Sequence, residues 1–171
     1  MLRGDRLILR EWRESDLGTI AELRNNIELQ ALLMTHAKPN SIEQVRRWLV
    51  ERTSRDDMIF FIVADRSDDA TLGFVQTANL DWLHGVGELG ICFSPSAQGL
   101  NLAQEACKLL NHYLRHTMGI RKLTLKVLAS NTRAIKFYQK DGYREVGRLE
   151  KQFLVDNEYQ DVVIMERFLS T

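Results

Sequence analysis

Residues that cross-link or interrupt a chain are scarce in this sequence, which holds two cysteines and two prolines among its 171 residues. Cys92 falls within an apolar strand pattern, and Cys107 lies on the apolar side of a helical pattern. The two do not form a CxxC motif, and free cysteines in apolar segments are usually buried. We therefore expect two buried thiols in a reducing compartment, with no disulfide and no bound metal.

An excess of charge of one sign and a long apolar run are also lacking. The chain carries 23 Lys and Arg against 23 Asp and Glu, so its overall charge favours neither nucleic acid nor a membrane as a partner. No segment approaches the ~20 apolar residues of a bilayer span, and the N-terminus lacks the apolar core of a secretory signal. We expect a cytoplasmic protein, and we interpret Arg46, Arg47 and Arg52 as a solvated helix face.

The composition that remains is that of one globular domain. Hydrophobic residues make up 44% of the chain and charged residues 27%, which is ordinary for a protein with a buried core. A chain of this length buries a sizeable core as a single unit. Because no repeat or linker interrupts the sequence, we expect one domain over residues 1–171.

Three helical patterns follow a strand signal at residues 5–12. The first begins at the capping residues 15–16, and the second, which is weaker, covers residues 27–34. The third begins at Ser41 and Gln44, which form a capping-box pattern. The apolar positions of this third helix are Ile42, Val45, Leu49 and Val50.

Strand patterns dominate the rest of the chain. A helical pattern at residues 102–117 connects the strands at 86–93 and 122–129, and such a crossover favours parallel neighbours. The sequence therefore predicts an α/β (α+β) fold with a mixed, mostly antiparallel sheet of about seven strands, a central parallel pair and about four helices. The remaining strands are expected at residues 58–65, 71–80, 143–154 and 160–168, and a short helix at 131–142.

The stretch FSPSAQGLNLAQEA, residues 93–106, joins a strand to a helix with little bulk or charge. Gly99 would let a ligand approach the backbone, and Asn101 tolerates the left-handed region. The first carboxylate is Glu105, so the partial positive charge of the helix start is left uncompensated. Such a start is a seat for phosphate. An ordinary helix capped by Ser96 fits this stretch equally well.

A second stretch, NTRAIKFYQKDGY at residues 131–143, favours the phosphate seat over the ordinary helix start. Together the two stretches resemble the GNAT superfamily of acetyl-CoA-dependent N-acetyltransferases, whose phosphate loop reads Gln/Arg-x-x-Gly-x-Gly/Ala. Residues 98–103 match that loop with Asn101 in place of its first glycine. The family's later helix reads Asn-x-x-Ala-x-x-x-Tyr-x-x-x-Gly-Phe/Tyr, which this chain matches at Asn131, Ala134, Tyr138, Gly142 and Tyr143. The resemblance covers nearly the whole chain and implies a GNAT fold.

The resemblance also implies acetyl-CoA as the co-substrate, and no metal. A strand that diverges from its neighbour would meet the pantetheine amides and the acetyl oxygen through the backbone of Ile91, Cys92 and Phe93. Asn131 would bind the cofactor arm, whereas Arg133 and Lys136 fit a nucleotide contact and a solvated face equally well. The pyrophosphate would be held by the backbone N–H groups of Gln98, Gly99, Leu100, Asn101, Leu102, Ala103 and Gln104. The side chain of Asn101 would crowd this pyrophosphate.

Acetyl transfer to an amine needs a proton for the departing thiolate and a group that takes a proton from the amine. The resemblance implies that Tyr138 is the acid, and a phenol with a pKa near ~10 can hydrogen-bond the sulfur. Glu88 is the leading candidate for the base, acting directly or through water. His84 is its rival, because an imidazole pKa near ~6.5 suits proton transfer.

The acceptor is the part of the reaction that the sequence constrains least. The resemblance extends to acetyltransferases of nucleotide-linked amino sugars, of spermidine and of ribosomal-protein N-termini, and we place the amino sugar first. A module that binds acyl-CoA without catalysis is the alternative of another class, and a homodimer is a further expectation. The candidate acceptor residues are Arg24, Asn25, Trp82, His84 and Tyr159.

Overall fold

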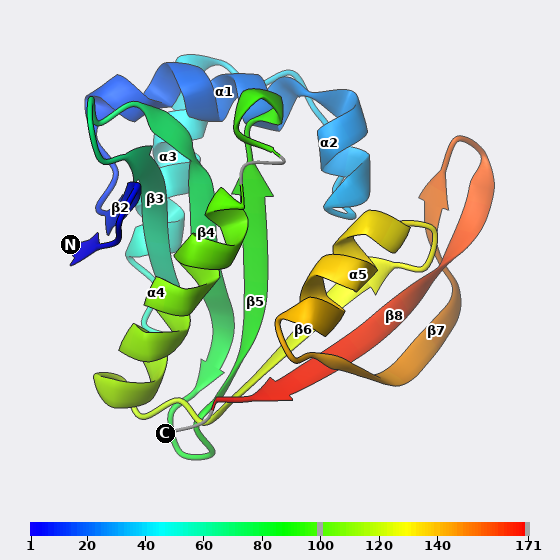
Figure 1. The fold of residues 1–171 in the computed structure, drawn as a ribbon. Coiled ribbons are helices and arrows are strands. Elements are labelled where there is room, and N and C mark those ends of the chain that lie inside the picture. Colours follow the sequence, from blue (N-terminus) through cyan, green and yellow to red (C-terminus); the bar gives the residue numbers. More distant parts are fainter. Residues whose placement is uncertain (99–100, 170–171) are drawn as a thin grey trace.

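A single mixed sheet forms the centre of the molecule (Figure 1). The computed structural model describes residues 1–98 and 101–169. In these residues the strands are β1 (Leu2–Arg3), β2 (Leu7–Arg10), β3 (Ile59–Asp65), β4 (Thr71–Asp81), β5 (Val86–Phe93), β6 (Lys122–Leu128), β7 (Arg144–Val155) and β8 (Glu158–Phe168). They lie in the order β1-β2-β3-β4-β5-β6-β8-β7, and every neighbouring pair is antiparallel except β5 and β6.

The predicted fold class is confirmed, and the number of elements is slightly larger than expected. The described residues form eight strands rather than about seven, because β1 pairs Leu2 with Leu9 and Arg3 with Ile8. Two residues are too short to give a periodic pattern in the sequence. The described part of the chain also has five α-helices rather than about four.

Helices cover both faces of the sheet (Figure 1). On one face, α1 (Leu17–Asn25) and α3 (Ile42–Thr53) contribute to one buried cluster, and α2 (Ile27–Leu32) follows α1 directly. On the other face, α4 (Leu102–His116) and α5 (Thr132–Lys140) pack against a second cluster. None of the helices in residues 1–98 and 101–169 is long and apolar enough to cross a membrane.

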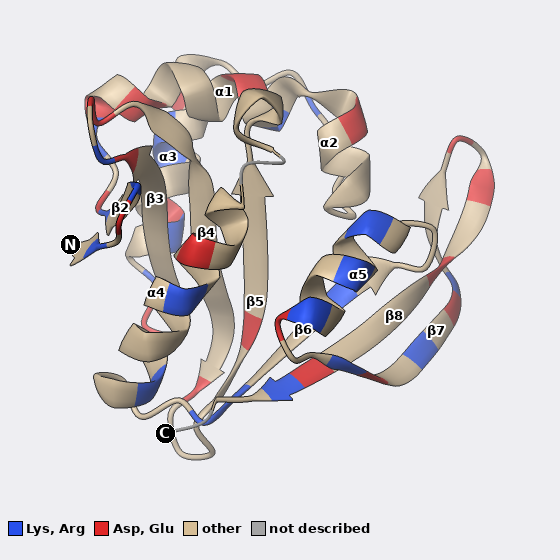
Figure 2. Cartoon of the chain, in the orientation of Figure 1, with Lys and Arg blue, Asp and Glu red and all other residues tan. Residues whose placement is uncertain are grey.

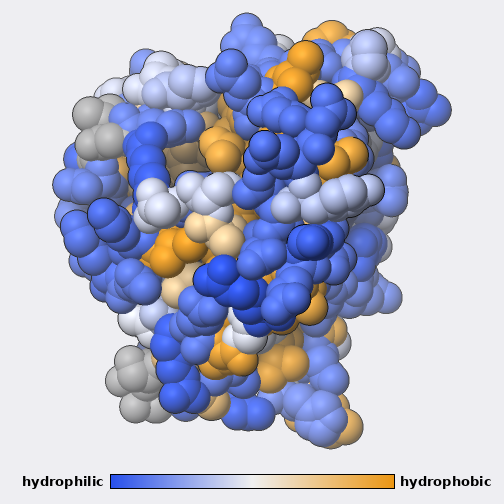
Figure 3. Space-filling model, turned by 90° about the vertical axis from the view of Figure 1, so that its right-hand side faces the viewer, coloured by the Kyte–Doolittle hydropathy of each residue, from blue (hydrophilic) through white to orange (hydrophobic). Residues whose placement is uncertain are grey.

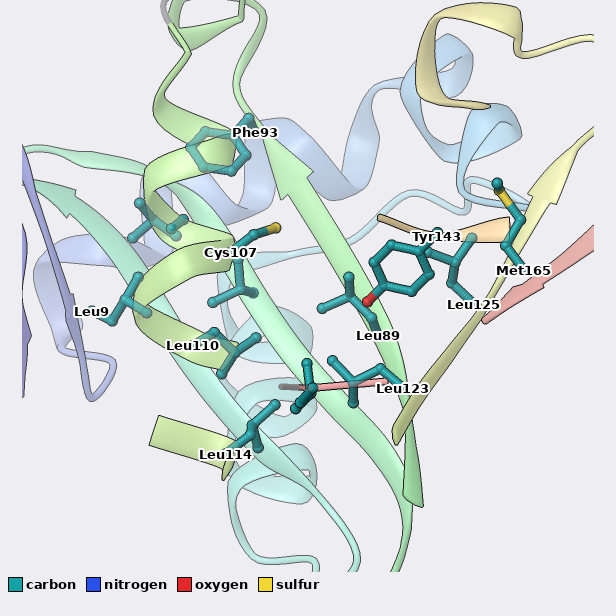
Figure 4. Packing of buried hydrophobic residues seen from close by; sticks show 14 of the residues in the cluster. Leu9, Leu89, Phe93, Cys107, Leu110, Leu114, Leu123, Leu125, Tyr143 and Met165 are labelled. Carbon is teal, nitrogen blue, oxygen red and sulfur yellow. The ribbon is translucent and has the colours of Figure 1, made fainter. Parts of the chain in front are cut away.

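The larger cluster lies between α4 and the sheet. Figure 4 shows Cys107, Leu110 and Leu114 of α4 facing side chains of the sheet, among them Leu89 and Leu123. Buried apolar residues recur along α4 at intervals of three and four, which is the period of one helix face. Both Cys92 and Cys107 are free and buried, as expected.

The smaller cluster holds α3 through a narrower stripe than the sequence suggests. Val45 and Leu49 are fully buried, whereas Ile42 and Val50 are 46% and 49% exposed. Val50 lies about 100° around the helix from Leu49, and Ile42 opens the first turn. The prediction that all four face the core is therefore wrong for Ile42 and Val50. The predicted capping box of Ser41 and Gln44 is present.

A buried ion pair anchors the start of α1. Both terminal nitrogens of Arg10 donate to the carboxylate of Asp16, each at 2.9 Å, and both residues have 0% exposure. The same carboxylate accepts the Arg13 N–H at 2.7 Å and the Thr71 hydroxyl at 2.5 Å. Asp16 was expected to cap α1, but its side chain makes no such bond to that helix. The buried guanidinium takes the carboxylate instead, because an unpaired charge there would be costly.

The central parallel pair is short, and this creates the site. β5 and β6 are in register only from Val86 opposite Lys122 to Glu88 opposite Thr124. Beyond that point β5 continues to Phe93 and β6 to Leu128 without pairing to each other. Figure 1 shows the two strands diverging toward their C-terminal ends. The divergence leaves backbone groups of β5 without a strand partner on that side.

Candidate active site

A cavity of about 790 Å³ opens where β5 and β6 diverge. Residues of α4 and α5 line it on one side of the sheet, and residues of α1, α2 and α3 line it on the other. The β7 strand closes a further wall, where Phe153 stacks on His36 with ring centroids 5.2 Å apart. Figure 3 shows the side that bears α5 and the β7–β8 hairpin, with hydrophobic patches between hydrophilic residues. The cavity therefore connects the two faces of the sheet.

The start of α4 has the backbone geometry that the sequence predicts. Asn101 is the N-cap residue in the left-handed conformation, with φ 58° and ψ 15°, and its side chain makes no capping bond. It lines the cavity together with Leu102 and Ala103. The N–H groups of the first turn point out of a helix start and carry partial positive charge. Gly99 and Leu100, which were also expected to hold the pyrophosphate, lie outside the described residues.

Glu105, the first carboxylate of α4, is engaged elsewhere. Its carboxylate accepts the backbone N–H of Arg6 at 2.9 Å and the Arg6 Nε at 3.1 Å. Burial raises the pKa of Glu105, but the hydrogen bonds from Arg6 outweigh burial and leave that pKa below its usual value. Glu105 is thus an ionised carboxylate paired with Arg6, and this pairing reduces its compensation of the helix start.

Gln98, an expected cofactor contact, meets Arg133, for which the sequence left a nucleotide contact and a solvated face equally open. Arg133 of α5 donates to the side-chain oxygen of Gln98 at 3.1 Å, and both residues line the cavity. Asn131 caps α5 by accepting the Ala134 N–H at 3.2 Å, so its amide nitrogen remains available toward the cavity. Lysine and arginine residues mark the exposed side of α5 in Figure 2. Gln104 is exposed on α4 and does not line the cavity.

Tyr138 lies on α5 with its ring half-buried against other aromatics. The ring centroid is 5.3 Å from Phe137 and 5.7 Å from Tyr143, both at edge-to-face angles. Tyr138 lines the cavity with Phe137. Burial raises the pKa of the Tyr138 phenol, and the nearby Cys107 and Asp141 raise it further. A protonated phenol at neutral pH is the form that can donate a proton to a leaving thiolate.

Glu88 is the last residue of β5 that pairs with β6, so its side chain stands where the strands diverge. It is held loosely. Asn79 donates to its carboxylate at 3.4 Å, and the Lys126 ammonium lies 3.7 Å away. Loose contacts leave the carboxylate able to accept a proton or to orient a water molecule.

Ile91, Cys92 and Phe93 line the cavity on the part of β5 that β6 does not cover. Burial raises the pKa of the Cys92 thiol to about 12. A neutral thiol is a poor nucleophile, because the thiolate is the reactive form. The structure therefore disfavours an acetyl-enzyme on Cys92 and leaves its backbone as the useful part.

The other side of the cavity contains two arginines and a tryptophan that the sequence analysis did not place together. The lining there includes Arg24 of α1 and both Trp48 and Arg52 of α3. The interpretation of Arg52 as part of a solvated face is wrong, because it lies one turn after Trp48 and shares its side of α3. A tryptophan four residues before an arginine on an amphipathic helix was the available signal. Arg46 and Arg47 do not line the cavity.

Of the five expected acceptor residues, Arg24 lines the cavity and the other four do not. The side-chain oxygen of Asn25 accepts a hydrogen bond from the backbone N–H of Asn40, and Trp82 donates to the Asp56 carbonyl at 3.1 Å. Trp82 and His84 lie in the β4–β5 connection, at the end of β5 opposite the divergence, and Tyr159 is 66% exposed in the β7–β8 hairpin. His84 therefore lies apart from the cavity that holds its rival Glu88.

No group of three or more His, Cys, Asp or Glu side chains in residues 1–98 and 101–169 is arranged to hold a metal ion. His112 and His116 lie one turn apart on α4 with ring centroids 4.4 Å apart, but no third His, Cys, Asp or Glu of the described residues joins them.

Comparisons with known proteins agree with this geometry. A family model described as an acetyltransferase (GNAT) domain matches residues 6–144. The spermidine N(1)-acetyltransferase of Vibrio cholerae is 24% identical over 159 residues, which is 93% of this chain and 91% of that protein. The enzyme of the same name from Escherichia coli K12 is 27% identical over 151 residues, 81% of each chain.

A solved structure shares the fold. The crystal structure of spermidine N-acetyltransferase from Vibrio cholerae in complex with CoA and spermine has a TM-score of 0.86. It is 24% identical in sequence and covers 95% of both chains. Another structure of the Vibrio cholerae enzyme is dodecameric.

Proposed function

Since this chain belongs to the GNAT acetyltransferase family, it is an enzyme that transfers an acetyl group from acetyl-CoA to an amine, and we propose that the acceptor is the primary amine of a small molecule. The observation that carries the proposal is the cavity at the β5–β6 divergence, which opens to both faces of the sheet. A donor on the α4–α5 side and an amine on the α1–α3 side would meet in the gap.

The donor side is built from backbone groups. The N–H groups that open α4 would bind the diphosphate, because a helix start is a ready anion site. Arg133 and the amide of Asn131 line the path from there to the gap. The stretch of β5 at Ile91, Cys92 and Phe93, which pairs with β4 but not with β6, would then align the pantetheine and hold the acetyl oxygen. Such positioning converts a bimolecular attack into one within a complex.

The chemical step follows from the two side chains at the gap. An ammonium is not nucleophilic, so Glu88 would take its proton directly or through water. The amine nitrogen then forms a bond to the thioester carbon, and the carbon–sulfur bond breaks. Tyr138 would donate its proton to the departing sulfur. The second proton that the nitrogen loses as the amide forms would restore the phenol, and Glu88 would release its proton to solvent. The neutral Cys92 thiol supports this direct attack over a covalent intermediate.

Polyamine is the second candidate for the acceptor class, and the names of the relatives favour it over the amino sugar that the sequence put first. The charge of the cavity weighs against a polycation. Glu88 is the one carboxylate among the described residues that line it, whereas a polycation gains most from several carboxylates. Neither observation favours a protein N-terminus. A non-catalytic acyl-CoA module does not fit the family assignment, and a homodimer stays a prediction.

The test is release of free thiol from acetyl-CoA with a panel of amines. The panel contains spermidine, spermine, amino sugars, amino acids and a peptide with a free N-terminus. We expect saturable release with at least one small amine, and intersecting double-reciprocal plots that indicate a ternary complex. Thiol release with the peptide alone would contradict the small-molecule proposal, and parallel plots would contradict direct attack.

A further inference from the structure

The acceptor side of the cavity has an unbalanced positive charge. Arg24, Arg52 and Lys126 line it there, and Glu88 is the only carboxylate among the described lining residues. Lys126 lies 3.7 Å from Glu88, so that pair is roughly neutral. The two arginines remain as an uncompensated double positive charge, since the guanidinium is protonated at any physiological pH.

The two arginines are held together by one tryptophan. The guanidinium carbon of Arg24 lies 4.2 Å from the centroid of the Trp48 ring, and that of Arg52 lies 4.5 Å from it. Trp48 itself packs edge-on against Phe60 at 5.8 Å and Phe74 at 5.6 Å. Cation–π contacts fix the guanidinium planes, and the packed indole fixes their position.

The described residues form no ion pair with these two arginines, although the charge of Glu51 acts weakly on Arg52. Arg24 donates to the Asn40 side-chain oxygen at 3.3 Å, and Arg52 donates to the Gln76 side-chain oxygen at 3.0 Å. Neither arginine takes part in any ion pair formed within residues 1–98 and 101–169. The Nε atoms of both are buried and have no hydrogen-bond partner in the described structure. Buried donors without partners are costly and are usually explained by a ligand or an ordered water.

Burial and like charge make the protonated form of these arginines less favourable. Burial lowers the pKa of Arg24. Burial and the positive charges of Arg24 and Arg55 lower the pKa of Arg52 by more than the negative charge of Glu51 raises it. Two half-buried like charges that face one cavity oppose folding unless a counter-charge enters. The favourable occupant is therefore an anion with acceptor oxygens for several N–H groups.

We propose that Arg24 and Arg52, fixed against Trp48, bind a phosphate or carboxylate group of the amine acceptor. The proposal deepens the acetyl transfer proposed above and rests on it for the amine. The site is distinct from the diphosphate seat, because α1 and α3 lie on the opposite face of the sheet from α4 and α5. The acceptor is thus an amine that carries an anionic group, and a bare polyamine is disfavoured by charge repulsion.

The first experiment compares amines that differ by one anionic group, using the wild-type enzyme. Glucosamine 6-phosphate against glucosamine tests phosphate, and lysine against cadaverine tests carboxylate. We expect kcat/KM to be at least tenfold higher for the anionic member of one pair, and that pair identifies the anion. Equal kcat/KM within both pairs, or highest kcat/KM with spermidine, would overturn the proposal while leaving acetyl transfer intact.

The second experiment does not depend on transfer. Inorganic phosphate is titrated by calorimetry into enzyme saturated with CoA, which fills the diphosphate seat. We expect saturable binding that Arg52→Gln weakens about tenfold to a hundredfold, as for loss of a hydrogen bond to a charged group. Arg47→Gln is the matched control, since it removes the same charge from the same helix at an exposed position outside the cavity.

The outcomes separate the two proposals. If phosphate binding depends on Arg52 but no amine gives thiol release, the result supports the anion site and contradicts the proposed reaction. If phosphate does not bind and the matched amines are turned over equally, the result contradicts the anion site alone. If Arg52→Gln fails to fold, the phosphate titration is repeated with Arg52→Lys, which keeps the charge. The matched amine pairs with the wild-type enzyme then test the anion site independently of any variant.

Discussion

The two sides of the cavity are built by different means. On the α4–α5 side the useful groups are main-chain groups at a helix start and a strand edge, and the notable residue is Asn101 with φ 58°. On the α1–α3 side they are long side chains, Arg24 and Arg52, that converge on Trp48. The first arrangement suits a donor that does not vary, and the second confers selectivity that side-chain changes can alter.

The two sides also differ in how they are anchored. Glu105 pairs with Arg6 near the surface on the donor side, and such pairs contribute at most about 1 kcal/mol. On the acceptor side, the fully buried Arg10–Asp16 pair fixes the start of α1, the helix that carries Arg24. Stability should therefore be more sensitive to charge removal on the acceptor side.

The largest effect is expected for Asp16→Asn, which removes the buried counter-charge of Arg10 and leaves it only the exposed Asp69, 2.7 Å from its Nε. We expect the free energy of unfolding to fall by about 3–5 kcal/mol, measured by urea denaturation. Glu105→Gln is the control and should cost about 1 kcal/mol or less. A loss for Asp16→Asn no larger than that of the control would show that the buried pair does not anchor α1.

The same pair predicts a pH dependence. Burial raises the pKa of Asp16, but hydrogen bonds from Arg10, Thr71 and Arg13 outweigh burial and leave the pKa below its usual value. A lowered folded pKa stabilises the fold above the unfolded pKa of about 3.9, and that stability is lost as the pH falls through the folded value. The wild-type unfolding free energy should therefore drop more steeply below about pH 4 than that of Asp16→Asn.

The next largest effect is expected for Tyr138→Phe, at the gap where the two sides meet. Loss of the proton donor should lower kcat about a hundredfold with little change in CoA affinity, measured by thiol release and calorimetry. Tyr113→Phe removes a phenol of α4 that does not line the cavity, and it should leave kcat unchanged. Because the pKa of Tyr138 is raised, any alkaline fall in kcat due to this phenol should lie above about pH 10. Unchanged turnover in Tyr138→Phe would remove the phenol from the mechanism.

A smaller effect is expected for Glu88→Gln. If Glu88 takes the proton of the amine, kcat/KM should fall about tenfold at neutral pH and recover at high pH, where the amine deprotonates unaided. Glu28→Gln on α2, outside the cavity, is the control. A deficit that stays constant with pH would indicate that Glu88 positions the acceptor and does not act as a base.

The smallest effect is expected for Asn101→Gly. Glycine adopts the left-handed conformation without a Cβ penalty and removes the side chain from the helix start. CoA should therefore bind with equal or severalfold higher affinity, measured by calorimetry. Weaker binding in Asn101→Gly would mean that the asparagine side chain contacts the cofactor, which would contradict a donor site made of main-chain groups.

The sequence predicted the donor side because residue types report backbone conformation. Asparagine at a helix start, the crossover at residues 86–129 and the pattern at residues 131–143 each constrain the main chain locally. The parallel β5–β6 pair was found as expected, and Asn101 has the left-handed conformation that asparagine tolerates. Asn131, which was expected only to bind the cofactor arm, also caps α5. These features depend on a few neighbouring residues, so a linear pattern records them.

The acceptor side was predicted poorly because it depends on distances between helices. The spacing of Trp48 and Arg52 indicates that these two share one side of α3, but nothing in the local sequence indicates that Arg24, from another helix, would join them. Trp82 and His84 were chosen for their chemistry, but their connection lies at the wrong end of β5. The burial of Arg10 was also missed, because the strand signal at residues 5–12 does not reveal that the carboxylate of Asp16 lies against its guanidinium.

The most direct test of the account is a crystal structure of the enzyme with CoA. We predict the diphosphate at the N–H groups that open α4, the pantetheine along the part of β5 that β6 does not pair with, and the sulfur within hydrogen-bonding distance of the Tyr138 hydroxyl. CoA lying outside the β5–β6 divergence, or a sulfur remote from Tyr138, would contradict it.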